Sequence, residues 1–490
     1  MKAKINNLLN VYKNLSTPAR ASIWFLFCNI LQMGLNVLST PIFTRIMEQD
    51  EFGITNTYNS WRSILIIFTS LNLSYGVFNN AMVKYEDAKT RDQYVSSMQC
   101  LYSLITCSYF IFYLIARNWC NRVLNMSTEL VVLMFVDLLC YPALLFWSGR
   151  QRYEFKYKGL VIITLLMTVA NITAGVIAVC LSENKAMAKI VSTIAVNVIF
   201  SGAFFIYHFV KGRKLVVLKF WKFALAFNIP LIPHYLSEMI LTQSDRIMIS
   251  KLENDAAVAN YTIAYSIVLI MQLIMSAISA SYLPWSYEQL KKKNYAALKQ
   301  MGNILLILIS GCIFLLMMFI PEIIYVFAGN KYADAVYAIP PIALSIFFMF
   351  LYELFSTVEF FYAKNIFVMI ASVIAAALNV GLNYYFIPIY GYYAAGYTTL
   401  FCYFAYAVGH FIFYRYICRK TLDIKDIYDK RFILLLAAVM LIITLAVNLV
   451  YGMVLVRYFM ALAIILIAFF KRNIIIDKFK IMKNKEDKEV

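Results

Sequence analysis

The amino-acid sequence predicts an all-α, polytopic membrane protein with about fourteen transmembrane helices. Apolar residues make up 62% of the chain and charged residues only 14%, whereas soluble domains carry about 25% charge. Segments such as 160–181 and 432–451 are almost uncharged and long enough to cross a bilayer. Composition therefore excludes a soluble fold.

An internal repeat divides the predicted spans into two related halves. Four pairs of positions recur in the same order at an offset of about 200 residues: Arg45 and Arg246, Tyr85-Glu86 and Tyr287-Glu288, Tyr94 and Tyr295, and Asn171 and Asn379. Both Tyr-Glu pairs are predicted to open charged loops. Six spans in each copy give the copies one orientation, which predicts a parallel repeat about an axis along the membrane normal.

The predicted organisation is two six-helix bundles followed by two further helices. The bundles are expected at 1–212 and 213–420, and the two extra helices with a basic cytoplasmic tail at 421–490. In chain order, the spans are predicted at 20–44, 53–80, 95–116, 127–148, 159–181, 187–210, 222–244, 257–284, 300–327, 335–361, 365–387, 391–414, 432–451 and 453–470.

The net charge of +18 is explained by membrane orientation rather than by nucleic-acid binding. When the N-terminus is placed in the cytoplasm, most of the 44 lysines and arginines fall on the cytoplasmic side, as the positive-inside rule requires. We therefore expect both termini in the cytoplasm. The basic and aromatic loop 150–158 is interpreted as an anchor at the cytoplasmic interface.

Polar side chains in the first two spans are candidates for a substrate-binding wall. Asn29, Gln32 and Asn36 are spaced by three and four residues, which places them on one helix face. Asn59 lies in the polar first half of the second span. Amides inside a span face protein or a cavity rather than lipid. They either bind sugar hydroxyls or hold helices together.

Arg62 and Asp137 are the charged residues expected deepest in the membrane. Each lies a similar distance along a span that starts from the outer side, so the two are expected at one depth near the bilayer centre. One interpretation is a permanent ion pair that joins two helices. The other is that Arg62 binds an anion in a water-filled cavity, because a guanidinium fork suits phosphate.

The seventh span contains two prolines three residues apart, and a kink is expected there. His234 and Glu238 follow one turn apart, after Pro230 and Pro233. This spacing is consistent either with a proton or cation relay or with a hydrogen bond between helices. His234 is also a candidate substrate-binding residue of the cavity, with Arg62 and the amides of the first two spans. Glu359 is interpreted as a residue at the membrane interface, and His208 and His410 as ordinary helix-end residues.

No catalytic or cofactor-binding motif is present in the sequence. Nucleotide-binding, hydrolase and metalloprotease signatures are missing, and the nine cysteines are scattered without metal-ligand spacing. We therefore expect no cofactor, no metal and no enzyme activity.

Several short motifs, in their order, resemble one family. They are Pro41-Ile42-Phe43-Thr44-Arg45 followed by Glu51-Phe52-Gly53, Asp245-Arg246-Ile247-Met248 followed by Tyr261, and Ile387-Pro388-Ile389-Tyr390-Gly391. Across residues 15–470 the pattern is similar to the bacterial polysaccharide-biosynthesis transporters. These are the O-antigen and capsule repeat-unit flippases of the multidrug/oligosaccharidyl-lipid/polysaccharide exporter superfamily.

The resemblance implies a mechanism and a cargo. It implies two six-helix bundles around a central cavity, alternating access, and an undecaprenyl-diphosphate-linked oligosaccharide as the transported lipid. It also implies location in the bacterial cell (inner) membrane, with a polysaccharide polymerase and other assembly proteins as partners and no nucleic acid.

Two alternatives stay open. A cation-coupled multidrug antiporter of the same superfamily usually carries an acidic residue in the first span, and this chain has none between Arg20 and Thr44. Asp137 or Glu238 could take its place. A membrane glycosyltransferase or polymerase would need an acidic pair and usually a large outer loop, which this chain lacks.

Overall fold

The computed structural model describes residues 15–362 and 365–483, which form helices and their connections. Residues Met1–Met239 and Ile240–Val490 form two compact units, called unit 1 and unit 2 below. Eleven of the described helices are long and apolar enough to cross a membrane. The prediction of an all-α, multi-pass membrane protein is therefore confirmed. Both chain ends, which we expect in the cytoplasm, lie outside the described residues.

Unit 1 is built around helix α9, which contacts α5, α7 and α8. Helix α2 contacts α8. The elements of unit 1 are α2 (Thr17–Ile46), α3 (Gln49–Ser70), α4 (Gly76–Lys84), α5 (Ala88–Ile115), α6 (Arg117–Leu124), α7 (Thr128–Tyr153), α8 (Tyr157–Leu181), α9 (Lys185–Gly212), α10 (Leu218–Asn228) and the 3₁₀ turn η1 (Ile229–Leu231).

Unit 2 is built around helix α15, which contacts α12, α13 and α17. The unit boundary falls within α11 (Ile232–Leu252). The other elements are α12 (Asp255–Lys291), α13 (Tyr295–Met318), α14 (Ile320–Phe327), the 3₁₀ helix η2 (Asn330–Tyr337), α15 (Ile339–Phe361), α16 (Asn365–Tyr390), α17 (Tyr393–Thr421), α18 (Lys430–Val450) and α19 (Val454–Lys483).

Side-chain caps start several of these helices as the local sequence dictates. The Asp87 carboxylate accepts from the Thr90 amide at the start of α5 (2.8 Å), and the Asn254 amide oxygen accepts from Ala257 at the start of α12 (2.8 Å). Each cap satisfies a backbone donor that the first helical turn leaves open.

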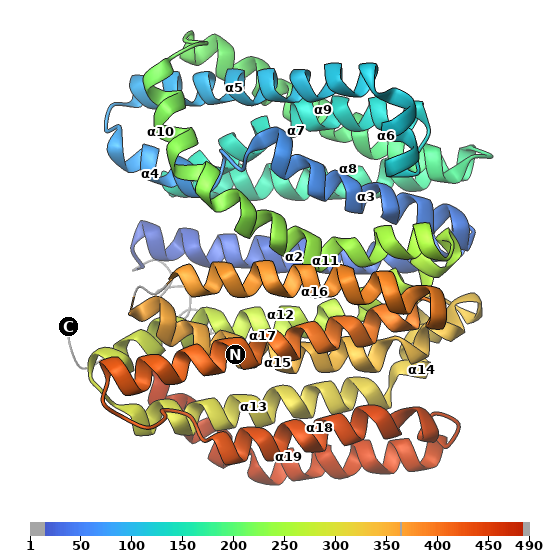
Figure 1. Ribbon diagram of the computed structural model, residues 1–490, viewed down its shortest axis with the longest axis vertical. Coiled ribbons are helices and arrows are strands. Elements are labelled where there is room, and N and C mark those ends of the chain that lie inside the picture. Colours follow the sequence, from blue (N-terminus) through green and yellow to red (C-terminus); the bar gives the residue numbers. More distant parts are fainter. Residues whose placement is uncertain (1–14, 363–364, 484–490) are drawn as a thin grey trace, which may run out of the picture. The chain divides into compact units, whose positions relative to one another are not determined.

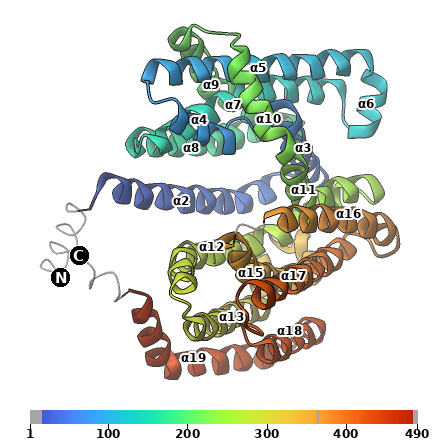
Figure 2. The same ribbon diagram turned by 60° about the vertical axis from the view of Figure 1, so that its left-hand side comes forward.

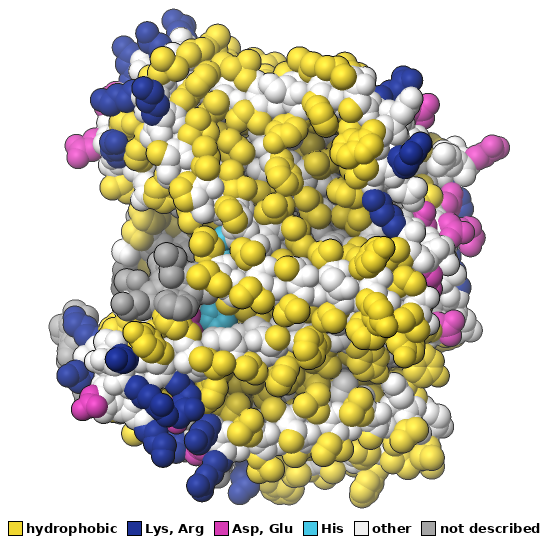
Figure 3. Space-filling view, viewed as in Figure 1, with side chains coloured by type: hydrophobic (Ala, Val, Ile, Leu, Met, Phe, Trp, Pro, Cys, Tyr) yellow, Lys and Arg dark blue, Asp and Glu magenta, His cyan; other side chains and the backbone are white. Residues whose placement is uncertain are grey.

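The helix flanks of each unit are covered with hydrophobic side chains, and charged side chains gather at helix ends (Figure 3). Ile115, Leu181 and Leu455 are each more than 80% exposed. Such exposure would destabilise a protein in water. It is the arrangement expected where the surrounding solvent is lipid.

Helices α18 and α19 lie side by side against α13 (Figures 1 and 2). A buried arginine joins α19 to α13 and α14. Arg457 of α19 donates to the Met318 carbonyl (2.6 Å) and forms two hydrogen bonds, of 2.8 and 2.7 Å, with the Glu322 carboxylate of α14. This bidentate contact combines charge with fixed geometry.

The predicted second span, 53–80, is wrong as a single helix. Helix α3 ends at Ser70 and α4 begins at Gly76, because Leu71 and Asn72 adopt left-handed backbone angles (φ 46° and 52°). The predicted charged loop at Tyr287-Glu288 is also wrong, since α12 continues through both residues to Lys291. The span predicted at 300–327 is divided into α13 and α14 near Phe319.

Three predicted spans are not among the eleven apolar helices. They are 53–80, which is broken; 222–244, which is interrupted by η1; and 391–414, which corresponds to the tyrosine-rich α17. The number fourteen therefore stays a prediction, as do the domain boundaries at 212 and 420.

One glycine lets α9 end directly against α5. A Cβ atom added at Gly212 would lie 2.3 Å from Ser96 Cβ and 2.4 Å from the Asp92 carbonyl oxygen. We expect Gly212→Ala to destabilise unit 1 by about 1–3 kcal/mol through overpacking. The measurement is the melting temperature of the purified protein. Gly202→Ala in the same helix meets nothing within 4 Å and is the matched control, expected to be neutral or slightly stabilising. Equal melting temperatures for the two variants would contradict the close packing of α5 and α9.

Candidate functional site

Arg62 and Asp137 meet inside unit 1. Arg62 Nε of α3 donates to Asp137 Oδ2 of α7, and Asn197 Nδ2 of α9 donates to the other carboxylate oxygen (2.8 Å). The Asp137 side chain is fully buried. The Arg62 guanidinium also lies 4.5 Å from the centre of the Tyr141 ring. Three helices are thus joined through one carboxylate.

The Arg62 guanidinium retains hydrogen-bonding capacity beyond its contact with Asp137. Its Nη2 atom is buried and forms no hydrogen bond with the described residues, while the side chain as a whole is 20% exposed. A buried donor of this kind is costly unless another group satisfies it. The arrangement therefore combines the expected ion pair with a buried guanidinium nitrogen whose hydrogen-bonding capacity is unused, which suits an anion.

The amides predicted to form a polar wall lie on α2 and α3. Asn29, Asn36 and Asn59 are exposed, and Gln32 is half-buried. Within the described part of the chain, their side chains form no hydrogen bond with each other or with Arg62. Their role as a substrate wall stays a prediction.

The kink predicted at the seventh span is confirmed. Helix α10 ends at Asn228, the turn η1 follows, and α11 begins at Ile232. Pro230 lies in the turn and Pro233 in the first turn of α11, where a backbone donor is not needed. His234 Nε2 and Glu238 Oε1 are 3.7 Å apart on α11. Their relay role stays a prediction.

The two helix breaks of unit 1 are joined by a residue that the sequence analysis missed. Asn228 is fully buried, and its Nδ2 donates to the carbonyls of Leu71 and Asn72, both at 2.9 Å. Both carbonyls lie in the break between α3 and α4, where the Asn72 carbonyl also accepts from the Tyr75 amide (3.1 Å). Broken helices with satisfied backbone groups are a recurring feature of transporter binding sites.

Unit 2 contains a second buried carboxylate, Asp245 of α11, which is 1% exposed. Its Oδ2 accepts from the Tyr261 hydroxyl of α12 and from Thr399 Oγ1 of α17 (3.0 Å). Its Oδ1 accepts from Asn383 Nδ2 of α16 (2.6 Å). Four helices are thus connected through this side chain, and we call these residues the Asp245 network.

The Asp245 network extends to neighbouring amides and hydroxyls. Asn379 Oδ1 accepts from Ser244 Oγ (2.9 Å) and from Asn383 (3.2 Å), and the Thr398 hydroxyl donates to Asn383 Oδ1. An ionisable residue inside a span is a functional candidate. A carboxylate surrounded by rearrangeable hydroxyls and amides can take up a proton or a cation when the helices move.

The interpretation of Glu359 and His410 as interface and helix-end residues is wrong. His410 Nδ1 of α17 lies 2.9 and 3.0 Å from the two carboxylate oxygens of Glu359 on α15, and both side chains are fully buried. His208, by contrast, has a structural contact with Gln99 (2.8 Å). Sequence position alone did not distinguish the two histidines.

The repeated residues Arg45 and Arg246 form the same local hydrogen bond in the structure. Arg45 Nη1 donates to the carbonyl of Pro41 (3.4 Å), and Arg246 Nη1 to that of Thr242 (3.0 Å), each four residues earlier. The superposition of the two halves stays a prediction.

Comparisons with known proteins agree with this architecture. A family profile described as "Polysaccharide biosynthesis protein" matches residues 19–290, and the MatE profile matches residues 230–385. A curated relative, Lsg locus putative protein 1 of Haemophilus influenzae, is 27% identical over 214 residues. The match covers 41% of this chain and 51% of the relative, so this chain spans about half of that protein's length.

Two solved structures share the fold. The lipid II flippase MurJ in an inward closed conformation has 15% identity and a TM-score of 0.67, covering 92% of this chain and 100% of that one. An inward-facing multidrug resistance MATE transporter of the MOP superfamily has 14% identity and a TM-score of 0.60, covering 78% and 94%. The chain belongs to the polysaccharide biosynthesis protein family and has the fold of the MOP-superfamily transporters.

Proposed function

We propose that this protein is a flippase that moves a lipid-linked oligosaccharide repeat unit across the bacterial inner membrane by alternating access. The cargo is an undecaprenyl-diphosphate-linked sugar chain destined for surface polysaccharide such as O-antigen or capsule. Membership of the polysaccharide biosynthesis protein family supports this function. So does the fold shared with a lipid II flippase.

The observation that carries the proposal is the guanidinium of Arg62. It is paired with Asp137, yet its Nη2 donor has no partner among the described residues. A diphosphate brings several acceptor oxygens, and a guanidinium fork binds two oxygens of one phosphate at once. In this proposal Arg62 binds the diphosphate of the cargo while Asp137 keeps the guanidinium oriented.

The amides on α2 and α3 serve the sugar part of the cargo. A buried hydroxyl without a partner costs a few kcal/mol, so a sugar chain needs donors and acceptors along its route. Asn29, Asn36 and Asn59 have side chains free of hydrogen bonds within the described part of the chain. The prenyl tail stays in lipid, and we propose that α18 and α19 guide it.

A cation-coupled multidrug antiporter is the second candidate function. The MatE profile covers residues 230–385, which include Asp245, and MATE transporters share the fold. If this candidate is correct, the purified protein moves organic cations against a proton or sodium gradient. If the flippase proposal is correct, it does not.

The proposed place of the protein in the cell follows from the cargo. Both termini face the cytoplasm, and a polysaccharide polymerase uses the lipid-linked repeat unit after it reaches the outer leaflet.

Cells that lack the protein are expected to make the lipid-linked repeat unit but to display no surface polysaccharide. The intermediate collects in the cytoplasmic leaflet, because the sugar cannot cross hydrocarbon unaided. The measurement is oxidation by periodate added to spheroplasts, followed by extraction of the lipid. The intermediate is expected to be shielded. Its appearance on the outer face, unpolymerised, would contradict the proposal and indicate a defect in polymerisation.

A further inference from the structure

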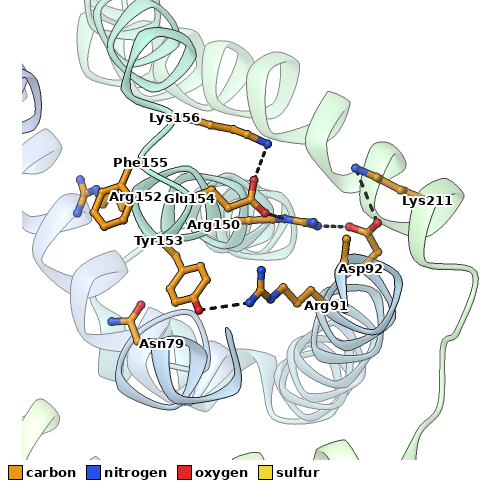
Figure 4. A pocket seen from close by; sticks show the side chains of 11 residues that line it. Asn79, Arg91, Asp92, Arg150, Arg152, Tyr153, Glu154, Phe155, Lys156 and Lys211 are labelled. Carbon is orange, nitrogen blue, oxygen red and sulfur yellow. Dashed lines mark hydrogen bonds and ion pairs between the residues drawn. The ribbon is translucent and has the colours of Figure 1, made fainter. Parts of the chain in front are cut away.

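Unit 1 contains a strongly basic pocket that the proposed transport route does not use (Figure 4). The open pocket has a volume of about 1020 Å³. Five cationic side chains line it together with two carboxylates, Asp92 and Glu154. The cationic residues are Arg91, Arg150, Arg152, Lys156 and Lys211. We call it the basic pocket.

Arg150 organises the wall of the basic pocket. It donates to Asp92 of α5 and, through Nε, to Glu154 Oε1 (2.8 Å). Lys156 Nζ lies 2.6 Å from the second oxygen of Glu154, and Lys211 Nζ of α9 lies 3.8 Å from Asp92. Partial burial raises the pKa of Glu154, but hydrogen bonds from Lys156 and Arg150 outweigh this and hold the pKa below its ordinary value. Both carboxylates are therefore already engaged by the wall itself.

Two arginines of the pocket have no carboxylate partner among the described residues. Arg91 is held in place, because its Nε donates to the Tyr85 carbonyl (2.6 Å) and its Nη2 to the Tyr153 hydroxyl (3.3 Å). The guanidinium also lies 4.9 Å from the centre of the Tyr153 ring. Arg152 is exposed. The pocket thus has three more positive than negative side chains and donors available to an anion.

An exposed aromatic ring lies at the rim of the pocket. Phe155 has a left-handed backbone (φ 54°) where α7 ends, a position that favours glycine, and its side chain is 42% exposed. An apolar ring beside arginines and lysines is typical of the depth where lipid headgroups meet acyl chains.

The position of the basic pocket along the spans indicates the same depth. Its walls come from the start of α5 and the ends of α7 and α9, all of which are long enough to cross a membrane. By the positive-inside rule these ends face the cytoplasm. That rule accounts for basic loops, but it does not require a half-buried arginine that binds two carboxylates in the wall of a pocket.

We propose that the basic pocket binds the phosphate group of an anionic lipid in the cytoplasmic leaflet. Arg91 and Arg152 supply forked donors to the phosphate oxygens, Lys156 and Lys211 add charge, and Phe155 contacts the adjoining glycerol or hydrocarbon. The shared chemistry is a phosphate ester on a lipid. Two kinds of lipid carry such a group, an ordinary phospholipid and a prenyl diphosphate. Free phosphate has the same oxygens without the lipid and serves as the comparison. The proposal requires the membrane-spanning fold but not the transport function.

The test uses the purified full-length protein in neutral detergent, with bound lipid measured by native mass spectrometry. The probes are phosphatidylglycerol, a prenyl diphosphate, phosphatidylcholine and inorganic diphosphate. Arg91→Gln/Arg152→Gln is compared with Lys89→Gln/Lys158→Gln, which removes the same charge from exposed residues that do not line the pocket. We expect at least about a tenfold weaker binding of the anionic lipids in the first variant and less than about a twofold change in the control.

Further arms separate recognition from folding and from general charge. Arg91→Lys/Arg152→Lys retains charge but loses the forks, and intermediate binding is expected. A melting temperature measured without lipid identifies any misfolded variant. If the Arg91→Gln/Arg152→Gln variant is misfolded, lipid binding by Arg91→Lys/Arg152→Lys is compared with that of the wild type instead. Preference for phosphatidylglycerol or for prenyl diphosphate assigns the headgroup. Equal loss in the glutamine pair and its control, or inorganic diphosphate binding as tightly as the lipids, would overturn the proposal.

Discussion

Replacing Arg62 by alanine is expected to abolish transport of the lipid-linked sugar while part of the protein still inserts into the membrane. The substitution removes the only cation that pairs with Asp137 among the described residues, and it removes the unsatisfied Nη2 donor. Breaking a buried ion pair in this way costs about 3–5 kcal/mol in soluble proteins. Transport must therefore be measured per molecule of folded protein. Arg62→Lys is expected to recover only part of the rate, because it retains charge without the fork.

A double variant separates a structural pair from a substrate site. In Arg62→Ala/Asp137→Ala no buried charge is left unpaired, so stability is expected to recover towards the wild-type value. Transport is expected to stay lost. If the double variant instead transports as the wild type does, the pair only joins α3 to α7, and Arg62 is not a ligand of the cargo.

Asp245→Ala is expected to have the largest effect of any substitution in unit 2. It leaves the Asn383 amide and the hydroxyls of Tyr261 and Thr399 without their shared acceptor. Each buried donor left unsatisfied costs about 1–3 kcal/mol. We expect a strongly lowered melting temperature and no transport.

Asp245→Asn is the matched substitution, because it has nearly the same shape and lacks the charge. The Tyr261 and Thr399 hydroxyls can rotate to suit an amide, so the melting temperature is expected to fall less than in Asp245→Ala. Transport is expected to stay lost if the carboxylate takes up a cation or proton during the cycle. Wild-type transport rates in Asp245→Asn would show that the Asp245 network is structural only.

The features that the sequence predicted are those set by local rules. The meeting of Arg62 and Asp137 followed from their equal depth along two spans, since helix rise is constant. The interruption near Pro230 followed from the missing backbone donor. The eleven long apolar helices could be predicted because each corresponds to a long, nearly uncharged segment of the sequence.

The features that the sequence did not predict depend on residues far apart in the chain. In the break after Ser70, the backbone carbonyls of Leu71 and Asn72 accept hydrogen bonds from Asn228. Asn228 is 156 residues beyond Asn72, and nothing in the segment Ser70–Gly76 identifies it as the partner. Packing of α15 against α17 brings Glu359 to His410, which is 51 residues further along the chain. The basic character of the loop after α7 is evident from its sequence, but the pocket also needs Arg91 of α5 and Lys211 of α9, which lie far from that loop in the chain.

The most direct test of the proposed function is movement of the lipid-linked repeat unit by the purified protein in vesicles. The cargo is incorporated into both leaflets, and periodate added outside reports the exposed fraction over time. We expect the shielded fraction to decline with wild-type protein and to persist with folded Arg62→Ala protein. A shielded fraction that persists with the wild-type protein under every ion gradient would contradict the flippase proposal, as would transport of organic cations in its place.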